Sequence, residues 1–242
     1  GQPVLVLDVG ANMDCKPAYM HQFALLGNIY CRDVLQVDRP RIGLLNIGEE
    51  ECKGNELSLR THELLREETR LHFAGNCEGR DVLSGEFDVV VCDGFTGNVA
   101  LKISESLAEM IGSNLKLMFQ SNWVSKLGYL LLKPKLVEFK KKVDHSETGG
   151  APLLGVNGVV IIAHGSSSPK AIKNAINRAQ ELSEKNIIEH IKQDIELNLS
   201  DIDNSKGTLW GQIKDIAFGG KEEQQNREDI HSSTDPKPKE TR

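Results

Sequence analysis

The sequence predicts an α/β fold of the three-layer α/β/α, Rossmann-like kind, with a mostly parallel sheet. Two observations lead to this prediction. Short continuous apolar runs alternate along the chain with longer segments whose apolar residues recur at helical spacing. Most of the runs end at Gly beside small polar residues, as buried parallel strands do where they turn into helices. Such alternation requires right-handed crossovers between parallel strands.

The first half of the chain supplies most of the expected sheet. The apolar runs expected to be strands are Val4–Leu7, Arg41–Ile47, His72–Gly75 and Asp88–Cys92. A helix should begin at Pro17, because the missing N–H of proline costs nothing in the first helical turn. A second helix is expected over Gly54–Glu68, with Leu57, Leu64 and Leu65 facing inward.

Two further helices and one strand are expected downstream. A long helix capped by Thr96 or Asn98 should bury one apolar face, made of Ile103, Leu107, Met110, Ile111, Leu115 and Met118. Val159–Ala163 is expected to be another buried strand. A helix capped by Ser166, Ser167 or Ser168 follows, with Pro169 near its first turn and an inward face of Ile172, Ala175, Ile176 and Ala179.

The domain organisation follows from where these patterns stop. Residues 1–204 are expected to form the α/β domain, and residues 205–242 a polar tail, disordered beyond Gly220 because almost nothing apolar remains. The opening Gly1-Gln2-Pro3 lacks an initiator Met and enters a strand almost at once, so we expect a chain cut from a longer one.

Composition excludes several classes. A net charge of -6 does not favour nucleic-acid binding, and no apolar run is long enough to span a membrane. The five widely spaced cysteines contain no CxxC pair, so neither a disulfide framework nor a zinc site is expected. Neither a Walker sequence nor GxGxxG occurs, and we expect no cofactor and no metal.

Four loops at strand ends are candidates for a ligand site, because ligands bind at the carboxyl ends of parallel strands. They are Asp8–Asn12, Asn46–Glu50, Asp93–Asn98 and His164–Ser167. Glycines let the backbone approach a ligand, and free N–H groups of the following helices would suit phosphate. Lys53 is either a surface lysine or a cation for an anionic substrate. Asn98 is a helix cap or an oxyanion donor, and His164 a satisfied histidine or part of the site.

Residues 122–143 form a basic amphipathic stretch, expected to be a helical hairpin bent at Pro134. Six lysines face one glutamate, with aromatic and aliphatic side chains between them. This composition fits an interfacial helix on anionic lipid, while a dimer interface or a strap across the core are the alternatives. The expected contact residues are Trp123, Lys126, Leu130, Leu131, Lys133 and Lys135.

Ordered motifs over about residues 3–185 make the sequence resemble the phosphate acyltransferases of phospholipid synthesis, the PlsX family, without the family's amino-terminal part. The motifs are Leu7–Asn12, Asp14–Pro17, Gly43–Glu50, Lys53–Glu56, Gly75–Asn76, Glu78–Asp81, Val91–Phe95, Gly97–Asn98, Gly149–Gly158 and His164–Ser167. The resemblance implies a fold similar to those of phosphotransacetylases and isopropylmalate dehydrogenases. It also implies conversion of acyl-[acyl carrier protein] and inorganic phosphate into acyl phosphate.

The resemblance also implies roles, partners and a location. Lys53, Asn98 and His164 would be catalytic. Phosphate or substrate would meet Asn12, Asn46, Gly48, Asp93, Gly97, Asn157, Gly165 and Ser166. The enzyme would be a cytoplasmic homodimer attached to the inner face of the cell membrane. It would take acyl groups from acyl carrier protein and feed a membrane-bound glycerol-3-phosphate acyltransferase.

Two other functions remain open from the residues alone. A phosphotransacetylase that uses coenzyme A would need the same pocket motifs, and only the expected lipid-facing hairpin favours the carrier protein. A non-catalytic, membrane-recruited scaffold is the second alternative, and the intact Lys53 and Asn98 motifs argue against it. A dehydrogenase lacks its dinucleotide fingerprint.

Overall fold

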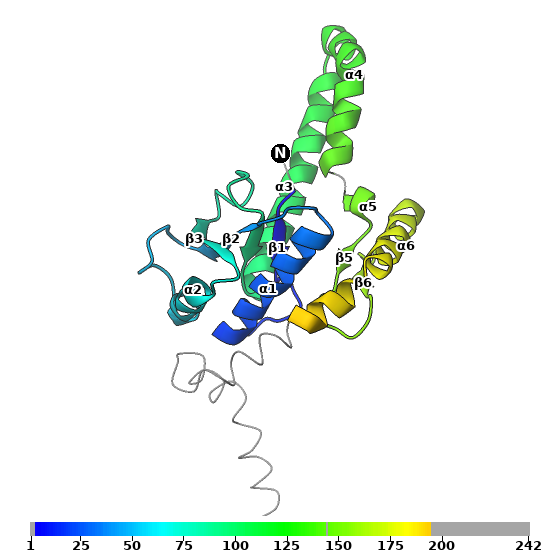
Figure 1. Ribbon diagram of the computed structural model, residues 1–242. Coiled ribbons are helices and arrows are strands. Elements are labelled where there is room, and N and C mark those ends of the chain that lie inside the picture. Colours follow the sequence, from blue (N-terminus) through cyan, green and yellow to red (C-terminus); the bar gives the residue numbers. More distant parts are fainter. Residues whose placement is uncertain (1–2, 144, 195–242) are drawn as a thin grey trace, which may run out of the picture.

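A computed structural model describes residues 3–143 and 145–194 of the chain (Figure 1). Its main sheet contains β1 (Leu5–Leu7), β2 (Arg41–Asn46), β3 (His72–Glu78) and β4 (Val89–Val91). The strands lie in the order β1-β4-β2-β3, and every pair is parallel. The four apolar runs of the first half are therefore confirmed as strands. The expected tail, residues 205–242, lies outside the described residues.

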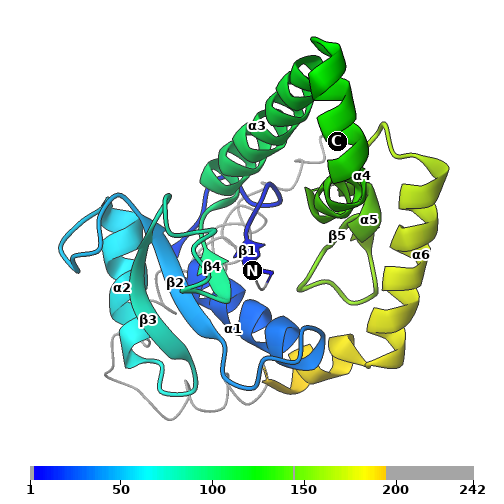
Figure 2. The same ribbon diagram turned by 90° about the horizontal axis from the view of Figure 1, so that it is seen from above.

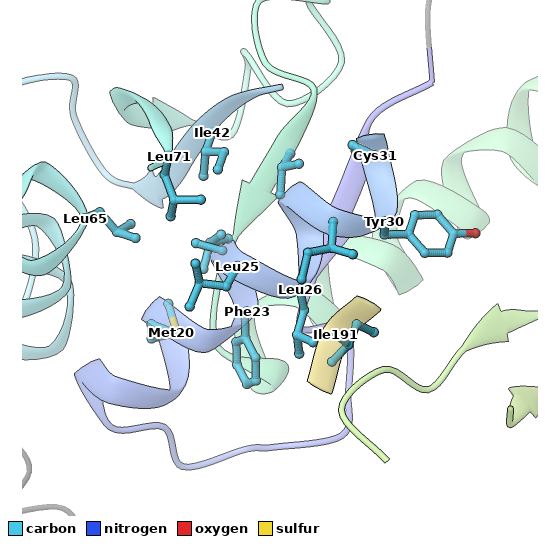
Figure 3. Packing of buried hydrophobic residues seen from close by; sticks show 14 of the residues in the cluster. Met20, Phe23, Leu25, Leu26, Tyr30, Cys31, Ile42, Leu65, Leu71 and Ile191 are labelled. Carbon is cyan, nitrogen blue, oxygen red and sulfur yellow. The ribbon is translucent and has the colours of Figure 1, made fainter. Parts of the chain in front are cut away.

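Helices α1 (Pro17–Asp33) and α2 (Glu56–Glu67) cover one face of this sheet and contact each other. The larger apolar cluster lies beneath them and includes Leu25 and Leu26 of α1 together with Ile42 and Leu65 (Figure 3). A smaller cluster of Cys77, Phe87 and Val90 occupies the opposite face, because successive side chains of a strand point to opposite sides. The sheet is flanked by helices, so the Rossmann-like three-layer α/β class is confirmed.

The expected strand Val159–Ala163 is not part of the main sheet. Its central residues form β6 (Ile161–Ile162), which pairs antiparallel with β5 (Ala151–Pro152) in a separate two-stranded sheet. Val160 and Ile162 remain 40% and 55% exposed, so the expectation of a buried parallel strand was wrong. A short β-branched run suits any pleated surface, and its composition does not select the partner strand.

Helix α6 (Pro169–Glu184) begins where expected, with Ser168 as its cap, but it turns a different face inward. Its buried residues are Ala171, Ala175 and Leu182, while Ile172 and Ile176 are exposed. Gly149 follows the short helix α5 (His145–Thr148). Its close contact with α6 explains why the buried face of α6 carries the small residues Ala171 and Ala175. A Cβ on Gly149 would lie 2.6 Å from the Asn174 carbonyl carbon and 2.8 Å from the Ala171 oxygen. The backbones approach so closely that only small side chains fit between them.

Helices α3 (Gly94–Gln120) and α4 (Trp123–Val143) form an antiparallel hairpin that projects from the body of the molecule (Figures 1 and 2). The expected hairpin within 122–143 was wrong, because this segment is one helix with Pro134 inside it. The reversal lies instead at Ser121 and Asn122, where the Asn122 side chain caps α4 by accepting the N–H of Ser125 at 2.8 Å. Because α3 already supplies an antiparallel partner, α4 needs no turn of its own.

The apolar face expected to be buried on α3 is largely exposed. Its exposed members are Ile103 (63%), Leu107 (49%), Met110 (53%), Ile111 (42%) and Met118 (65%). Helical spacing places these residues on one face but does not say what covers that face. Among the described helices, none combines the length and the apolar character needed to cross a bilayer.

A buried carboxylate ties the end of α2 to α1. Glu68 is 9% exposed, accepts Nε of Arg70 at 2.8 Å and Nη2 of Arg70 at 2.7 Å, and lies 3.2 Å from Nε2 of His21. Burial opposes ionisation of Glu68, but the hydrogen bonds with His21 and Arg70 outweigh it and lower its pKa from 4.5 to about 2. The carboxylate is therefore charged wherever the protein is folded under ordinary conditions.

We expect Glu68 to make stability depend on pH. The unfolded chain binds the proton more readily, so the stabilisation is complete above about pH 4.5 and is lost as the pH falls towards about 2. Glu68→Gln should lower the free energy of unfolding near neutral pH by on the order of 3 kcal/mol and flatten its pH dependence in that window. Urea unfolding across the window measures both effects. Glu63→Gln, which loses only a surface pair with Arg60, is the control. An equally steep pH dependence in Glu68→Gln would contradict the assignment.

Candidate functional site

Three of the expected loops meet at the carboxyl edge of the main sheet. Residues 8–12 follow β1, residues 47–53 follow β2 and residues 93–98 follow β4, and β4 lies between β1 and β2. The fourth loop, His164–Ser167, follows β6 of the separate sheet. The expectation that all four converge on one sheet edge was therefore wrong.

Asp8 organises the loop after β1. Its carboxylate accepts the N–H groups of Gly10 (2.8 Å), Ala11 (2.9 Å) and Asn12 (2.7 Å), and also Nδ2 of Asn12 (2.9 Å). Burial alone would raise the pKa of Asp8, but these four hydrogen bonds lower it below its usual value of 3.8. The Asn12 amide therefore holds Asp8 through one N–H of its Nδ2. We did not assign Asp8 a role from the sequence, although an Asp two residues before Gly at a strand end is the signal that marks it.

The first turn of α3 is not an open anion site. Asp93, not Thr96 or Asn98, caps the helix by accepting the Thr96 N–H at 2.8 Å and its hydroxyl at 2.7 Å. The Gly94 N–H donates to the Asn12 carbonyl and the Gly97 N–H to the Asp93 carbonyl. These donors are occupied, and the Asp93 carboxylate adds negative charge at the helix end. Three N–H groups of the first turn of α3, those of Gly94, Thr96 and Gly97, are therefore already hydrogen-bonded within the protein.

Gly97 permits the close approach of α3 to β1. A Cβ on Gly97 would lie 2.8 Å from Sγ of Cys92 and 2.9 Å from the carbonyl carbon of Asp8. Distances this short are not tolerated between real atoms, so Gly97 acts through its lack of a side chain and not as a ligand. Its neighbour Asn98 lies over Gly10, with Oδ1 of Asn98 3.7 Å from where a Gly10 Cβ would stand.

Lys53 and Asn98 are side-chain donors that remain available on neighbouring strand ends. Asn98 is half-buried, and no described residue hydrogen-bonds its amide. Nζ of Lys53 has one described anionic neighbour, Oε1 of Glu50 at 4.0 Å, and its side chain is 47% exposed. Since β2 and β4 pair directly, these two donors follow adjacent strands. The arrangement offers one positive charge and one amide to an incoming anion or carbonyl oxygen.

The loop that carries Lys53 is hydrogen-bonded to the last residue of β2. Asn46 donates through Nδ2 to the Lys53 carbonyl at 3.0 Å and accepts the Ile47 N–H at 2.8 Å, so both ends of its amide contact the backbone. A Cβ on Gly48 would lie 2.8 Å from Cγ of Lys53, so glycine here leaves room for the lysine. Asn46 and Gly48, which were expected to meet the ligand, thus also shape the loop.

A shallow apolar groove of about 480 Å³ begins at Asn98 and follows α3. Its lining residues are Asn98, Val99, Lys102, Ile103, Ser106, Leu107 and Met110. The Asn98 amide therefore lies at one end of this apolar groove.

The remaining expected site residues lie in loops next to the strands of the second sheet. His164 and Ser166 bond each other, with Nδ1 of His164 2.6 Å from Oγ of Ser166 and 3.2 Å from its N–H. An N–H can only donate, so Nδ1 accepts and the neutral ring carries its proton on Nε2. Gly165 is exposed beside them, and Asn157 is exposed in the loop joining β5 and β6. No described hydrogen bond or ion pair joins these residues to Lys53 or Asn98.

Cys92 lies beside the site but is a poor nucleophile. Burial, reinforced by Asp93 and Asp8, raises the pKa of its thiol to about 12, and Sγ donates to the Asp8 carbonyl at 3.3 Å. The described residues contain no group of three or more His, Cys, Asp or Glu side chains able to hold a metal ion.

The fold is that of an open α/β protein, a class in which ligands bind at the carboxyl ends of the strands, and Lys53 and Asn98 follow two of those ends. A family model described as "Fatty acid synthesis protein" matches residues 1–190. The chain belongs to this family.

Curated relatives are similar over most of the chain. A phosphate acyltransferase of Parasynechococcus marenigrum is 62% identical over 79% of this chain and 45% of its own length. Phosphate acyltransferases of Prochlorococcus marinus and Thermosynechococcus vestitus are 62% and 54% identical, each over 79% of this chain and over 44% and 56% of their own lengths. The chain thus spans about half the length of these relatives.

Proposed function

We propose that the chain carries the acyl-transfer site of a phosphate acyltransferase, which converts acyl-[acyl carrier protein] and inorganic phosphate into acyl phosphate for phospholipid synthesis. The observation that carries the proposal is the pair of free donors, Lys53 and Asn98, at the ends of adjacent strands β2 and β4. The names of the relatives at 54–62% identity support the reaction class.

The proposed chemistry needs only these donors. Lys53 holds the phosphate dianion by charge and aims one oxygen at the thioester carbonyl. As the C–O bond forms, the carbonyl oxygen becomes an oxyanion, which the Asn98 amide stabilises by donating a hydrogen bond. The tetrahedral intermediate collapses by breaking the C–S bond, and the carrier protein leaves as a thiolate, which takes up the proton released by the attacking hydrogen phosphate. The acyl chain follows the apolar groove away from Asn98.

An acyl phosphate assay tests the proposal. The chain is supplied with long-chain acyl carrier protein and inorganic phosphate, and in parallel with acyl-coenzyme A and phosphate. Acyl phosphate from the carrier substrate supports the proposal. Product from coenzyme A alone would assign a phosphotransacetylase instead. Absence of product from both substrates, together with no detectable phosphate binding, would contradict an acyl-transfer site in this chain.

We also propose that the hairpin of α3 and α4 contacts the inner surface of the cell membrane. Trp123, Leu130 and Leu131 are 76%, 64% and 75% exposed, and they stand among the exposed lysines Lys126 and Lys133. Apolar side chains flanked by lysines bind anionic lipid by burial and by charge together. Lys135, which pairs with Glu138, completes the basic side, and this surface also suits an acidic carrier protein.

The exposed apolar side chains of α3 fit the proposed homodimer, because a second copy would remove them from water. A product released at the membrane would pass directly to the proposed membrane-bound acyltransferase.

Leu130→Glu with Leu131→Glu should weaken binding to anionic vesicles by at least about tenfold, since two exposed apolar side chains become anionic. Vesicle sedimentation measures the effect. The matched control is Ile172→Glu with Ile176→Glu, which makes the same change at exposed positions of α6 and should leave binding nearly unchanged. Equal loss in both double variants would indicate a general charge effect and remove the hairpin from membrane contact.

A further inference from the structure

We propose that Asn76 is a positioning residue that, with Asn46, holds the turn carrying Lys53 in place for an anionic ligand. The inference rests on the proposed function and extends it to a residue that contacts neither phosphate nor acyl group. Three observations support it: a hydrogen bond at each end of the turn, and a buried acceptor left without a partner.

The first observation is the contact between Asn76 and the turn. Asn76 lies on β3 opposite Leu44 of β2, and it is 6% exposed. Its Nδ2 donates to the Glu50 carbonyl at 2.8 Å. The same carbonyl accepts the Lys53 N–H at 3.1 Å, which closes the turn. The Glu50 carbonyl oxygen therefore accepts two hydrogen bonds, one from within the turn and one from the sheet.

The second observation is the matching contact at the other end. Nδ2 of Asn46 donates to the Lys53 carbonyl at 3.0 Å. The side-chain amides of Asn76 and Asn46, on paired strands, thus hydrogen-bond to the first and last residues of the turn, Glu50 and Lys53. Because β2 and β3 are hydrogen-bonded along their lengths, the two amides stand on one rigid base.

The third observation is that Oδ1 of Asn76 is buried and has no hydrogen-bond partner among the described residues. The reversed amide would place Oδ1 against the Glu50 oxygen, two acceptors that repel, so the observed orientation is the favourable one. An unpaired buried acceptor lowers stability, and an apolar side chain of similar size would avoid this cost. The cost of the unpaired Oδ1 is offset by the hydrogen bond that Nδ2 of Asn76 donates to the Glu50 carbonyl.

The consequence concerns Lys53. Its side chain has one described ionic contact, at 4.0 Å and partly in water, which directs it only weakly. The position of its Nζ therefore follows from the backbone that Asn76 and Asn46 hold. A looser turn spreads the lysine over more positions and weakens its hold on an anion.

The test compares the chain with Asn76→Leu, Asn46→Ala and the control Asn114→Leu, an exposed asparagine whose amide bonds only within α3. Three quantities are measured: the urea midpoint, hydrogen exchange of the Lys53 amide by NMR, and amide shifts on titration with inorganic phosphate. For Asn76→Leu we expect an unchanged or higher midpoint. Exchange at Lys53 should be roughly tenfold faster and phosphate affinity roughly tenfold weaker, as for losing one hydrogen bond. Asn46→Ala should show the same exchange and affinity changes.

Two results would overturn the inference. One is unchanged Lys53 exchange in Asn76→Leu. The other is a lower midpoint with faster exchange throughout the sheet, which would make Asn76 a plain structural residue. The proposed function is judged separately, because its failure would appear as absence of any phosphate response in the unmodified chain, while the exchange comparison still decides the role of Asn76.

Discussion

Lys53→Ala should reduce acyl phosphate formation by a factor of about 100 or more, the usual effect of removing one fixed donor from a reacting oxygen. The ammonium is the cation that the described loops present at the end of β2, and its nearest described partner, Glu50, stands at 4.0 Å. Alanine leaves no charge to hold phosphate. The loss should appear in kcat/KM in steady-state assays of acyl phosphate, with the KM for phosphate raised.

The fold should survive this substitution. The Lys53 side chain is 47% exposed, so Lys53→Ala should change the free energy of unfolding by no more than about 0.5 kcal/mol. Lys173→Ala, at an exposed position of α6, is the matched control and should keep full turnover. Lys53→Arg keeps the charge but replaces a compact ammonium by a planar fork, so it should recover only part of the activity. Normal turnover in Lys53→Ala would remove Lys53 from the mechanism.

Gly97→Ala should destabilise the protein by about 3 kcal/mol, at the upper end of what overpacking costs. The added methyl group would stand 2.8 Å from Sγ of Cys92 and 2.9 Å from the Asp8 carbonyl carbon. Two of its nearest atoms belong to the Asp8 backbone, which cannot rotate away, so the first turn of α3 has to move away from β1. Asn98 is the next residue, and phosphate binding should weaken with the fold.

Gly112→Ala is the control for this prediction. Gly112 lies on the exposed part of α3, and a Cβ there would meet nothing within 4 Å. Alanine inside a helix is favoured over glycine, so this variant should gain up to about 1 kcal/mol. Urea unfolding of both variants measures the contrast. If Gly97→Ala were as stable as Gly112→Ala, the close approach of α3 to β1 would not be a requirement of the fold.

Much of the site could be found from the sequence because it depends on local signals. Lys53 and Asn98 follow apolar runs that end in glycine, and ligands gather at such strand ends. In the structure, the nearest described anionic partner of Lys53 is Glu50 at 4.0 Å, and no described residue hydrogen-bonds the Asn98 amide. The sequence did not show that the side chains of Asn12, Asn46 and Asp93 form hydrogen bonds within the loops themselves. An amide or carboxylate in a loop looks the same in the sequence whether it binds a ligand or a neighbouring N–H.

Asp8 and Asn76 are residues whose structural roles the sequence did not reveal. Both are buried polar residues within the motifs named above, and each acts by hydrogen bonds to a loop. Asp8 gathers N–H groups of its own loop, whereas Asn76 reaches residue 50 from a strand that lies next to β2 in space. No periodicity in the chain marks such a contact.

The sequence by itself determined the class of fold, the order of the elements in the first half and the strand ends that carry the candidate donors, because strands, helix starts and glycine turns are encoded by neighbouring residues. Only the tertiary structure decided which elements meet. It moved Ile161 and Ile162 into a separate antiparallel pair, and it made α4 the partner of α3. It also left the apolar face of α3 exposed. The physical reason is that periodicity specifies which side chains share a face, while the surface that covers this face belongs to residues far away in the chain.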